Sequence, residues 1–257
     1  MEEELIKKIK QKKEFSMLPE KDVELVFEKI NTPFRTDEEK IKMTRDLLRK
    51  IYTVFLSNKL LKIKRKNFDW FLKKHLSTRE RFHYYSELYR KIIGNSGEKI
   101  KIYDLGCGIN GFSFPFFKKE GFDVEYVGVE AVGQLVDLQK SFFKNSKKVS
   151  FFHESPFDIN KISEIVKKGK GTKIVFLFKV IDSLEMLERN YSKKFLTHLT
   201  PLVDKVVLSF ATRSIQSKKK FFANRKWIRD FISDNFNLVE EFDLGGENYI
   251  IFSEKDL

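Results

Sequence analysis

Hydrophobic residues recur with a helical period through the first third of the chain. Pro19 opens one such pattern, and a capping box formed by Thr36 and Glu39 opens the clearest one. The apolar positions after this box fall on one helical face: Ile41, Leu47, Leu48, Ile51, Tyr52, Phe55 and Leu56. The run Gly94-Asn95-Ser96-Gly97 then interrupts the pattern. We therefore expect an all-helical N-terminal lobe over residues 1–95 and a second domain over residues 96–257.

From residue 99 onward, short apolar runs alternate with helical patterns. The expected strands are 100–104, 124–129, 149–152, 173–178 and 203–210, and the expected helices are 111–120, 132–144, 158–168, 184–199 and 221–235. The run Ile174–Phe178 is apolar throughout, as is typical of a parallel strand covered on both faces. Residues 238–244 and 249–252 flank two glycines and predict a C-terminal hairpin. This layout predicts an α/β domain of the class I methyltransferase (Rossmann-like) fold, with a seven-stranded, mostly parallel sheet and an antiparallel C-terminal hairpin strand.

A glycine-rich loop follows the first expected strand, with the pattern Asp104-x-Gly106-x-Gly108. Gly106 and Gly108 lack a Cβ, so the backbone can turn tightly and let a ligand approach. We expect a helix to start near Gly111 and to offer its N–H groups and positive dipole end to an anion. Asp104 would hold a cationic or hydroxyl group beside the loop. This combination suits S-adenosylmethionine, which carries a carboxylate, an ammonium and a sulfonium.

The same loop also fits a dinucleotide fingerprint. Gly106, Gly108 and Gly111 satisfy G-x-G-x-x-G, and Glu130 lies nineteen residues beyond Gly111. An NAD-dependent oxidoreductase is therefore an alternative. Asp104, two positions before the first glycine, and the C-terminal hairpin both favour the methyl donor.

Acidic residues end three of the expected strands. In addition to Asp104, Glu130 ends the second strand, where its carboxylate can accept both ribose hydroxyls. Glu154, with Ser155, ends the third strand, where an acceptor can meet the adenine amino group. The chain has a single cysteine, Cys107, and we expect neither a disulfide nor a metal site.

Positive charge is concentrated toward the N-terminus. The net charge is +13, and residues 1–95 hold 24 Lys and Arg against 15 Asp and Glu. Such a bias is typical of a protein that binds nucleic acid. The expected phosphate contacts are in two basic runs: Lys62, Lys64, Arg65 and Lys66, and Lys218, Lys219 and Lys220. With no apolar run approaching the roughly 20 residues of a membrane helix, we expect a cytoplasmic monomer.

The residues after the fourth strand bear on the target atom. Enzymes that methylate amino groups of bases usually carry an Asn/Asp-Pro-Pro-aromatic loop there, but this chain reads Phe178-Lys179-Val180-Ile181-Asp182. Carbon-5 methylation of pyrimidines needs a cysteine nucleophile, and Cys107 lies in the glycine loop. A ring nitrogen such as guanine N7 needs neither device, because its lone pair carries no proton and alignment supplies the catalysis.

Four segments resemble those of the 16S rRNA guanine-N7 methyltransferases that confer aminoglycoside resistance (the Arm/Rmt group). Lys74–Phe82 resembles their H-x-S-T-R-E-R-L, and Asp104–Asn110 resembles D-L-A-C-G-L-N-P. Phe176–Lys179 with Leu184-Glu185 resembles L-L-K-x-L-P-x-L-E, and Ser209–Ser214 resembles S-F-P-T-R-S-L. The matches occur in family order.

This resemblance implies a helical lobe that docks on the 30S subunit and an α/β domain that methylates N7 of a decoding-centre guanine in 16S rRNA. It implies that the first segment contributes His75, Ser77, Arg79 and Arg81 to the cofactor site, with one of the two arginines reaching the cofactor carboxylate. Lys179 and Arg213 are implied to lie near the target nucleotide as catalytic residues.

Two further functions remain open. The enzyme could methylate another RNA position, such as a tRNA base or a ribose 2′-oxygen, for which Lys179 could take up the hydroxyl proton. Alternatively, the chain could be a non-catalytic RNA-binding or ribosome-assembly protein on the same fold.

Overall fold

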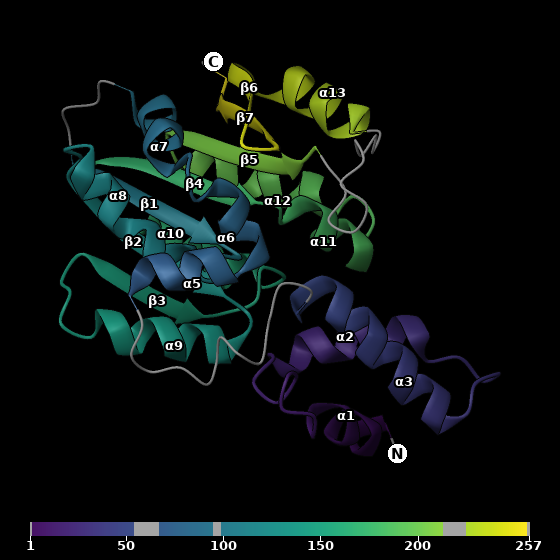
Figure 1. Ribbon diagram of the computed structural model, residues 1–257. Coiled ribbons are helices and arrows are strands. Elements are labelled where there is room, and N and C mark those ends of the chain that lie inside the picture. Colours follow the sequence, from purple (N-terminus) through teal and green to yellow (C-terminus); the bar gives the residue numbers. More distant parts are fainter. Residues whose placement is uncertain (1, 54–66, 95–98, 213–224, 256–257) are drawn as a thin grey trace.

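The computed structural model describes residues 2–53, 67–94, 99–212 and 225–255 (Figure 1). The N-terminal helices are α1 (Glu2–Lys10), α2 (Glu20–Ile30), α3 (Asp37–Leu48) and a π-helical turn, η1 (Arg49–Thr53), followed by α5 (Phe68–Lys74), α6 (Leu76–Arg81) and α7 (Tyr85–Ile93). The strands are β1 (Ile100–Leu105), β2 (Val124–Glu130), β3 (Val149–His153), β4 (Thr172–Phe178), β5 (Lys205–Ala211), β6 (Asn237–Leu244) and β7 (Glu247–Ser253). Between the strands lie the 3₁₀ turns η2 (Asn110–Ser113) and η3 (Thr200–Leu202) and the helices α8 (Phe114–Lys119), α9 (Gly133–Phe143), α10 (Ile159–Lys167), α11 (Ile181–Leu187), α12 (Tyr191–Leu199) and α13 (Lys226–Asn235).

The strands form one seven-stranded sheet in the order β3-β2-β1-β4-β5-β7-β6. The first five are parallel, whereas β7 runs antiparallel to both β5 and β6. The predicted fold class is confirmed, including the C-terminal hairpin. Strand order reverses between β1 and β4, and in open α/β sheets ligands bind at such a point, outside the carboxyl ends of the strands.

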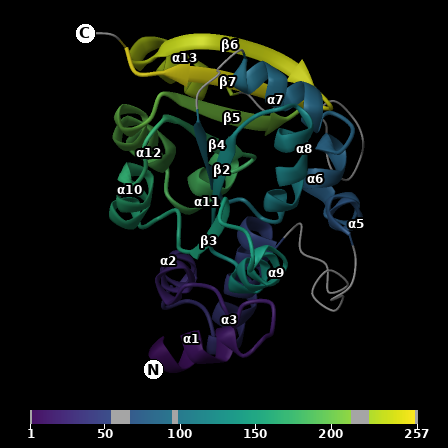
Figure 2. The same ribbon diagram turned by 90° about the vertical axis from the view of Figure 1, so that its left-hand side faces the viewer.

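Helices cover both faces of the sheet, with α10 and α12 on one side and α7 and α8 on the other (Figure 2). This double cover explains the apolar run of β4, whose residues 174–178 are all buried. Tyr89 of α7 stacks on Phe117 of α8, with ring centroids 3.8 Å apart. Their packing joins the helices before the sheet to the core of the α/β domain.

Helices α1–α3 and α5–α7 lie in different places, although all precede the linker predicted at residue 94. Figure 1 shows α1–α3 as a lobe apart from the sheet, whereas α5–α7 lie across it. Phe71 of α5 stacks on Phe112 of η2 at 4.6 Å between centroids. The helical prediction for this part of the chain therefore agrees with the described residues, and α5–α7 belong by packing to the α/β core. Among the described helices, none is long and apolar enough to cross a membrane.

The α1–α3 lobe contacts the carboxyl-end edge of the sheet. The Gly133 N–H donates to the carbonyl of Met17 at 3.3 Å. The Ser155 hydroxyl donates to the carboxylate of Asp22, which is fully buried. These contacts bring η1, at the end of the lobe, to the place where a ligand is expected.

One long predicted helix is in fact two. The pattern over residues 184–199 predicts a single helix, but the structure has α11 and α12, separated at Asn190 with φ of +65°. The carboxylate of Glu185 accepts the N–H groups of Asn190 at 2.8 Å and Ser192 at 2.9 Å. An acidic side chain that satisfies the free N–H groups of the next helix stabilises this break.

Candidate active site

A cavity lies at the carboxyl ends of β1, β2 and β4, where the strand order reverses. Its lining comes from six parts of the chain: the η1 turn, α6, the loop after β1, the segment after β2, the segment after β3, and the end of β4. Ile51 and Tyr52 of η1 close one side of the cavity. A π-helical turn often occurs at a functional site, and this one lets the N-terminal lobe share in the lining.

Gly106 and Gly108 line the cavity, with φ values of +72° and +54°. A Cβ on Gly106 would lie 2.7 Å from Cγ2 of Val180, so the position needs glycine on two grounds.

The prediction of an α-helix that starts near Gly111 and binds an anion differs from the structure in detail. The segment at Gly111 is the 3₁₀ turn η2, and α8 starts only at Phe114. The Gly111 N–H donates to Oε1 of Gln139 at 3.1 Å, and the Asn110 N–H donates to the Cys107 carbonyl at 2.7 Å. Because the N–H groups of Gly111 and Asn110 already have partners, an anion in the cavity would need other donors.

Asp104 lines the cavity and is buried. Its Oδ2 accepts from the Asn110 amide at 2.7 Å and from the Tyr126 hydroxyl at 2.6 Å. Burial raises the pKa of this carboxyl, and the two hydrogen bonds partly oppose the rise. With Oδ2 fixed in this way, the carboxylate has a set orientation toward the cavity.

Glu130 also lines the cavity, at the end of β2. Its Oε2 accepts the Gly108 N–H at 2.7 Å, and its Oε1 accepts the Val132 N–H at 2.8 Å. Burial raises the pKa of Glu130, while these backbone bonds lower it. A carboxylate has about four lone-pair sites, so the backbone N–H groups of Gly108, Ala131 and Val132 leave capacity for a ligand hydroxyl.

The structure does not bring Glu154 and Ser155 to the described lining. Glu154 pairs with Lys161 at 3.2 Å, and Ser155 is bound to Asp22 of the N-terminal lobe. The cavity wall after β3 comes instead from Pro156 and Phe157. An apolar wall suits the face of a nucleobase, and sequence reasoning missed it because no polar residue marks it.

The two candidate arginines both lie on helix α6 but face different surroundings. Arg79 is exposed, whereas Arg81 is 3% exposed and lines the cavity with His75 and Ser77. The Arg81 guanidinium lies 4.8 Å from the ring centroid of Phe178, and its Nη2 donates to the Ser77 hydroxyl at 3.1 Å. Its Nε and Nη1 are buried and make no hydrogen bond among the described residues, but Nη1 forms an ion pair with Glu247 Oε2 at 3.5 Å. Arg81 is therefore the arginine able to take up a carboxylate in the cavity.

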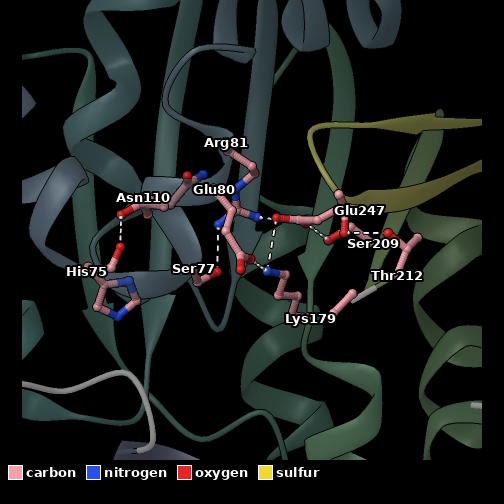
Figure 3. A network of polar contacts seen from close by, with 12 residues as sticks. His75, Ser77, Glu80, Arg81, Asn110, Lys179, Ser209, Thr212 and Glu247 are labelled. Carbon is pink, nitrogen blue, oxygen red and sulfur yellow. Dashed lines mark hydrogen bonds and ion pairs between the residues drawn. The ribbon is translucent and has the colours of Figure 1, made fainter. Parts of the chain in front are cut away.

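A buried carboxylate, Glu247 at the start of β7, faces this arginine (Figure 3). Its Oε2 lies 3.5 Å from Arg81 Nη1, and its Oε1 lies 3.2 Å from Lys179 Nζ. Lys179 also pairs with Glu80 of α6. Burial by itself lowers the pKa of Arg81, but Glu247 together with Tyr85, Tyr249 and Asp104 outweighs it, so the pKa lies above the ordinary value. Both cations are thus charged groups held at one end of the cavity.

The remaining site predictions concern Cys107, residues outside the described part of the chain, and metal binding. Cys107 lines the cavity, and burial raises the pKa of its thiol well above the ordinary value, so the thiol is not a nucleophile near neutral pH. Arg213 and both basic runs (Lys62, Lys64, Arg65 and Lys66; Lys218, Lys219 and Lys220) lie outside the described residues. Their expected roles stay predictions. In the part of the chain that is described, no group of His, Cys, Asp and Glu could hold a metal ion.

His75 is neutral in this site. Burial, followed by the positive charges of Arg81 and Lys179, lowers the pKa of His75 to about 3. In the unfolded chain a histidine takes up a proton near pH 6.5, so stability present above that pH is lost as the pH falls toward about 3.

Acidification from pH 7 to pH 5 should therefore cost the natural protein more stability than His75→Gln. We expect its free energy of unfolding to fall by about 2 kcal/mol more than that of the variant. Urea unfolding of both proteins at pH 7 and pH 5 measures the two losses of stability. The other titrating groups are the same in both proteins, so their contributions cancel when the two losses are subtracted. Equal losses in the two proteins would contradict the neutral, buried state of His75.

A known protein family matches the segments of the chain that form this site. A profile of the ribosomal RNA methyltransferase (FmrO) family matches residues 65–228, which include α6, the glycine loop and Lys179. The chain belongs to this family. A curated relative, the 16S rRNA (guanine(1405)-N(7))-methyltransferase of Proteus mirabilis, is 28% identical over 184 residues. That match covers 70% of this chain and 62% of the relative, so the chain spans less than two thirds of its length.

Solved structures share the fold across 98% of the chain. The 16S rRNA methyltransferase RmtF, crystallised with S-adenosyl-L-homocysteine, superposes with a TM-score of 0.78 at 17% identity over 98% of both chains. An rRNA methylase from Escherichia coli gives 0.76 at 16% identity, over 98% of this chain and 99% of the other. At these identities the likeness concerns the fold alone, and it includes the helical N-terminal region.

Proposed function

We propose that this protein is an S-adenosylmethionine-dependent methyltransferase that modifies guanine N7 in 16S rRNA of the 30S subunit. The observation that carries the proposal is Arg81, which is buried, lines a cavity at the strand-order reversal, and has an Nε that makes no hydrogen bond among the described residues. Membership of an rRNA methyltransferase family supplies the context. The Proteus relative, named for guanine N7, supports the choice of atom.

The residues present fit the proposed cofactor. The buried Nε–H of Arg81 can donate to its carboxylate, and Asp104 can accept from its ammonium. Glu130 has capacity for a ribose hydroxyl, and Phe157 offers an apolar wall to the adenine. When bound, S-adenosylmethionine supplies a methyl group on a positively charged sulfur, and that charge is lost as the methyl group leaves.

Lys179 supports N7 over a ribose oxygen. Transfer to N7 forms an N–C bond from a lone pair and releases no proton, so no general base is needed. A ribose hydroxyl must lose its proton to an acceptor. Lys179 is paired with both Glu80 and Glu247, so two carboxylates hold its ammonium. We assign it to the phosphate of the target nucleotide.

Incubation with 30S subunits and methyl-labelled S-adenosylmethionine tests this function. We expect label in 16S rRNA, chain cleavage by the borohydride–aniline chemistry specific for N7-methylguanosine, and one modified guanine on mass-spectrometric mapping. Label on a ribose or in tRNA would favour the other RNA methyltransferase functions. Cofactor binding without transfer to any RNA would favour an assembly protein.

The wider setting follows from the same proposal. A 30S substrate places the protein in the cytoplasm, and we propose that it acts as a monomer whose two basic runs contact rRNA phosphates. We further propose that the modification protects the ribosome from aminoglycosides. Expression in a susceptible strain should raise the inhibitory concentration of an aminoglycoside, and an unchanged concentration would contradict this role.

A further inference from the structure

We propose that Glu247 is a positioning residue of this active site: a shared counter-ion that sets the places of Arg81 and Lys179. The inference rests on the proposed function for what the two cations do. It assigns a role to the C-terminal hairpin, which lies outside the residues matched by the family profile.

The geometry gives each oxygen of Glu247 a different cation. Oε2 lies 3.5 Å from Arg81 Nη1, and Oε1 lies 3.2 Å from Lys179 Nζ. The side chains of Glu247, Arg81 and Lys179 are 0%, 3% and 7% exposed. Two like charges this close, with so little water to screen them, repel unless an opposite charge lies between them. Glu247 is that charge, and Figure 3 shows both cations converging on it.

Ser209 of β5 fixes the carboxylate in place. Its hydroxyl donates to Glu247 Oε2 at 2.7 Å, and its carbonyl accepts the N–H of Lys179 at 3.0 Å. The adjacent turn is held as well, because the Thr212 N–H donates to the Gly246 carbonyl at 3.0 Å. One residue of the sheet therefore holds both the backbone of Lys179 and the carboxylate that its ammonium meets.

Lys179 has a second carboxylate partner in a different place. Glu80 is 34% exposed and belongs to α6, whereas Glu247 is fully buried in the hairpin. Without the charge of Glu247, Lys179 is drawn to Glu80 alone, away from Arg81. Arg81 then has a cofactor carboxylate as its main counter-ion. Loss of Glu247 should thus misplace Lys179 without weakening the hold of Arg81 on the cofactor.

Glu247→Gln tests this, because it keeps the side-chain shape and an acceptor for Ser209. We expect kcat for 30S methylation to fall at least twentyfold with KM for 30S within threefold of the natural value. By calorimetry, S-adenosylhomocysteine should bind at least as tightly as to the natural protein. Glu247→Asp, which keeps the charge, should recover part of kcat. Glu241→Gln, on the exposed side of the same hairpin and paired with Arg229, is the matched control and should match the natural protein.

Two outcomes would overturn the proposal: an unchanged kcat in Glu247→Gln, or a loss of cofactor affinity in step with kcat, which would mean a structural role only. If Glu247→Gln does not fold, Ser209→Ala decides, because it frees the carboxylate while keeping every charge. It should lower kcat three- to tenfold with unchanged cofactor affinity, and natural values would overturn the proposal. Absence of methylation by the natural protein would instead reject the proposed function. In that case the S-adenosylhomocysteine affinity of Glu247→Gln would still test the proposal, and a weaker affinity than that of the natural protein would contradict it.

Discussion

Arg81→Lys is expected to weaken the binding of S-adenosylhomocysteine by about 10- to 100-fold. Arg81 is buried beside Glu247, Ser77 and the ring of Phe178, and its Nε makes no hydrogen bond within the described part of the chain. Hydrogen bonds to charged groups contribute about 1.5–3 kcal/mol each. Lysine keeps the charge opposite Glu247 but has no planar fork with which to hold a carboxylate through two parallel bonds.

Arg79→Lys is the matched control for this measurement. Arg79 lies on the same helix and is exposed, so its replacement should leave the affinity within twofold. Calorimetric titration of both variants, with circular dichroism to verify that each is folded, measures the effect. Equal affinities for Arg81→Lys and the natural protein would remove Arg81 from the cofactor site, and a loss in Arg79→Lys would reassign the contact.

The choice between the two arginines was within reach of the sequence. Successive residues turn by 100° on a helix, so Arg79 and Arg81 cannot share a face. Arg81 lies four positions after Ser77, and the two side chains are hydrogen-bonded in the structure. The apolar positions Tyr85 and Leu88 continue from the same side. Helical geometry therefore indicates Arg81 as the buried residue of the pair.

The strands and the glycine loop could be predicted because their signals are local. An apolar run such as 174–178 gives a buried strand directly, and Gly106 needs a positive φ that few other residues adopt. Glu247 carries no comparable signal. It follows two glycines and is typical of a hairpin turn, and only the pairing of β7 with β5 brings it opposite Ala211 and next to the cavity.

Tyr52 and Phe157 were missed for a related physical reason. Each reaches the cavity through a contact between distant segments: Tyr52 through docking of the N-terminal lobe, and Phe157 through the loop that Ser155 anchors to Asp22. Apolar residues at such positions look like ordinary core in the sequence. The polar half of the site is thus readable from strand ends, whereas its apolar half depends on the tertiary arrangement.

Lys179→Met should lower methyl transfer to 30S subunits by about 10- to 100-fold while cofactor affinity stays within threefold. Methionine keeps most of the length and removes the charge that pairs with Glu80 and Glu247. Loss of one charge-assisted contact to a phosphate accounts for a change of this size. Lys161→Met, which removes an exposed lysine paired with Glu154, is the control and should retain full activity.

The pH dependence of the natural enzyme then separates two roles for Lys179. As a fixed positive charge in transfer to N7, it gives a kcat that is flat between pH 6.5 and 8.5. As the proton acceptor for a ribose hydroxyl, it gives a kcat that rises with pH over this range and loses the rise in Lys179→Met. The ion pairs of Lys179 with Glu80 and Glu247 do not favour proton uptake by Lys179, and a pKa of about 3 makes His75 a weak base. A flat profile together with N7-methylguanosine in the product is therefore the expected result, and a rising profile would contradict the assignment of the target atom.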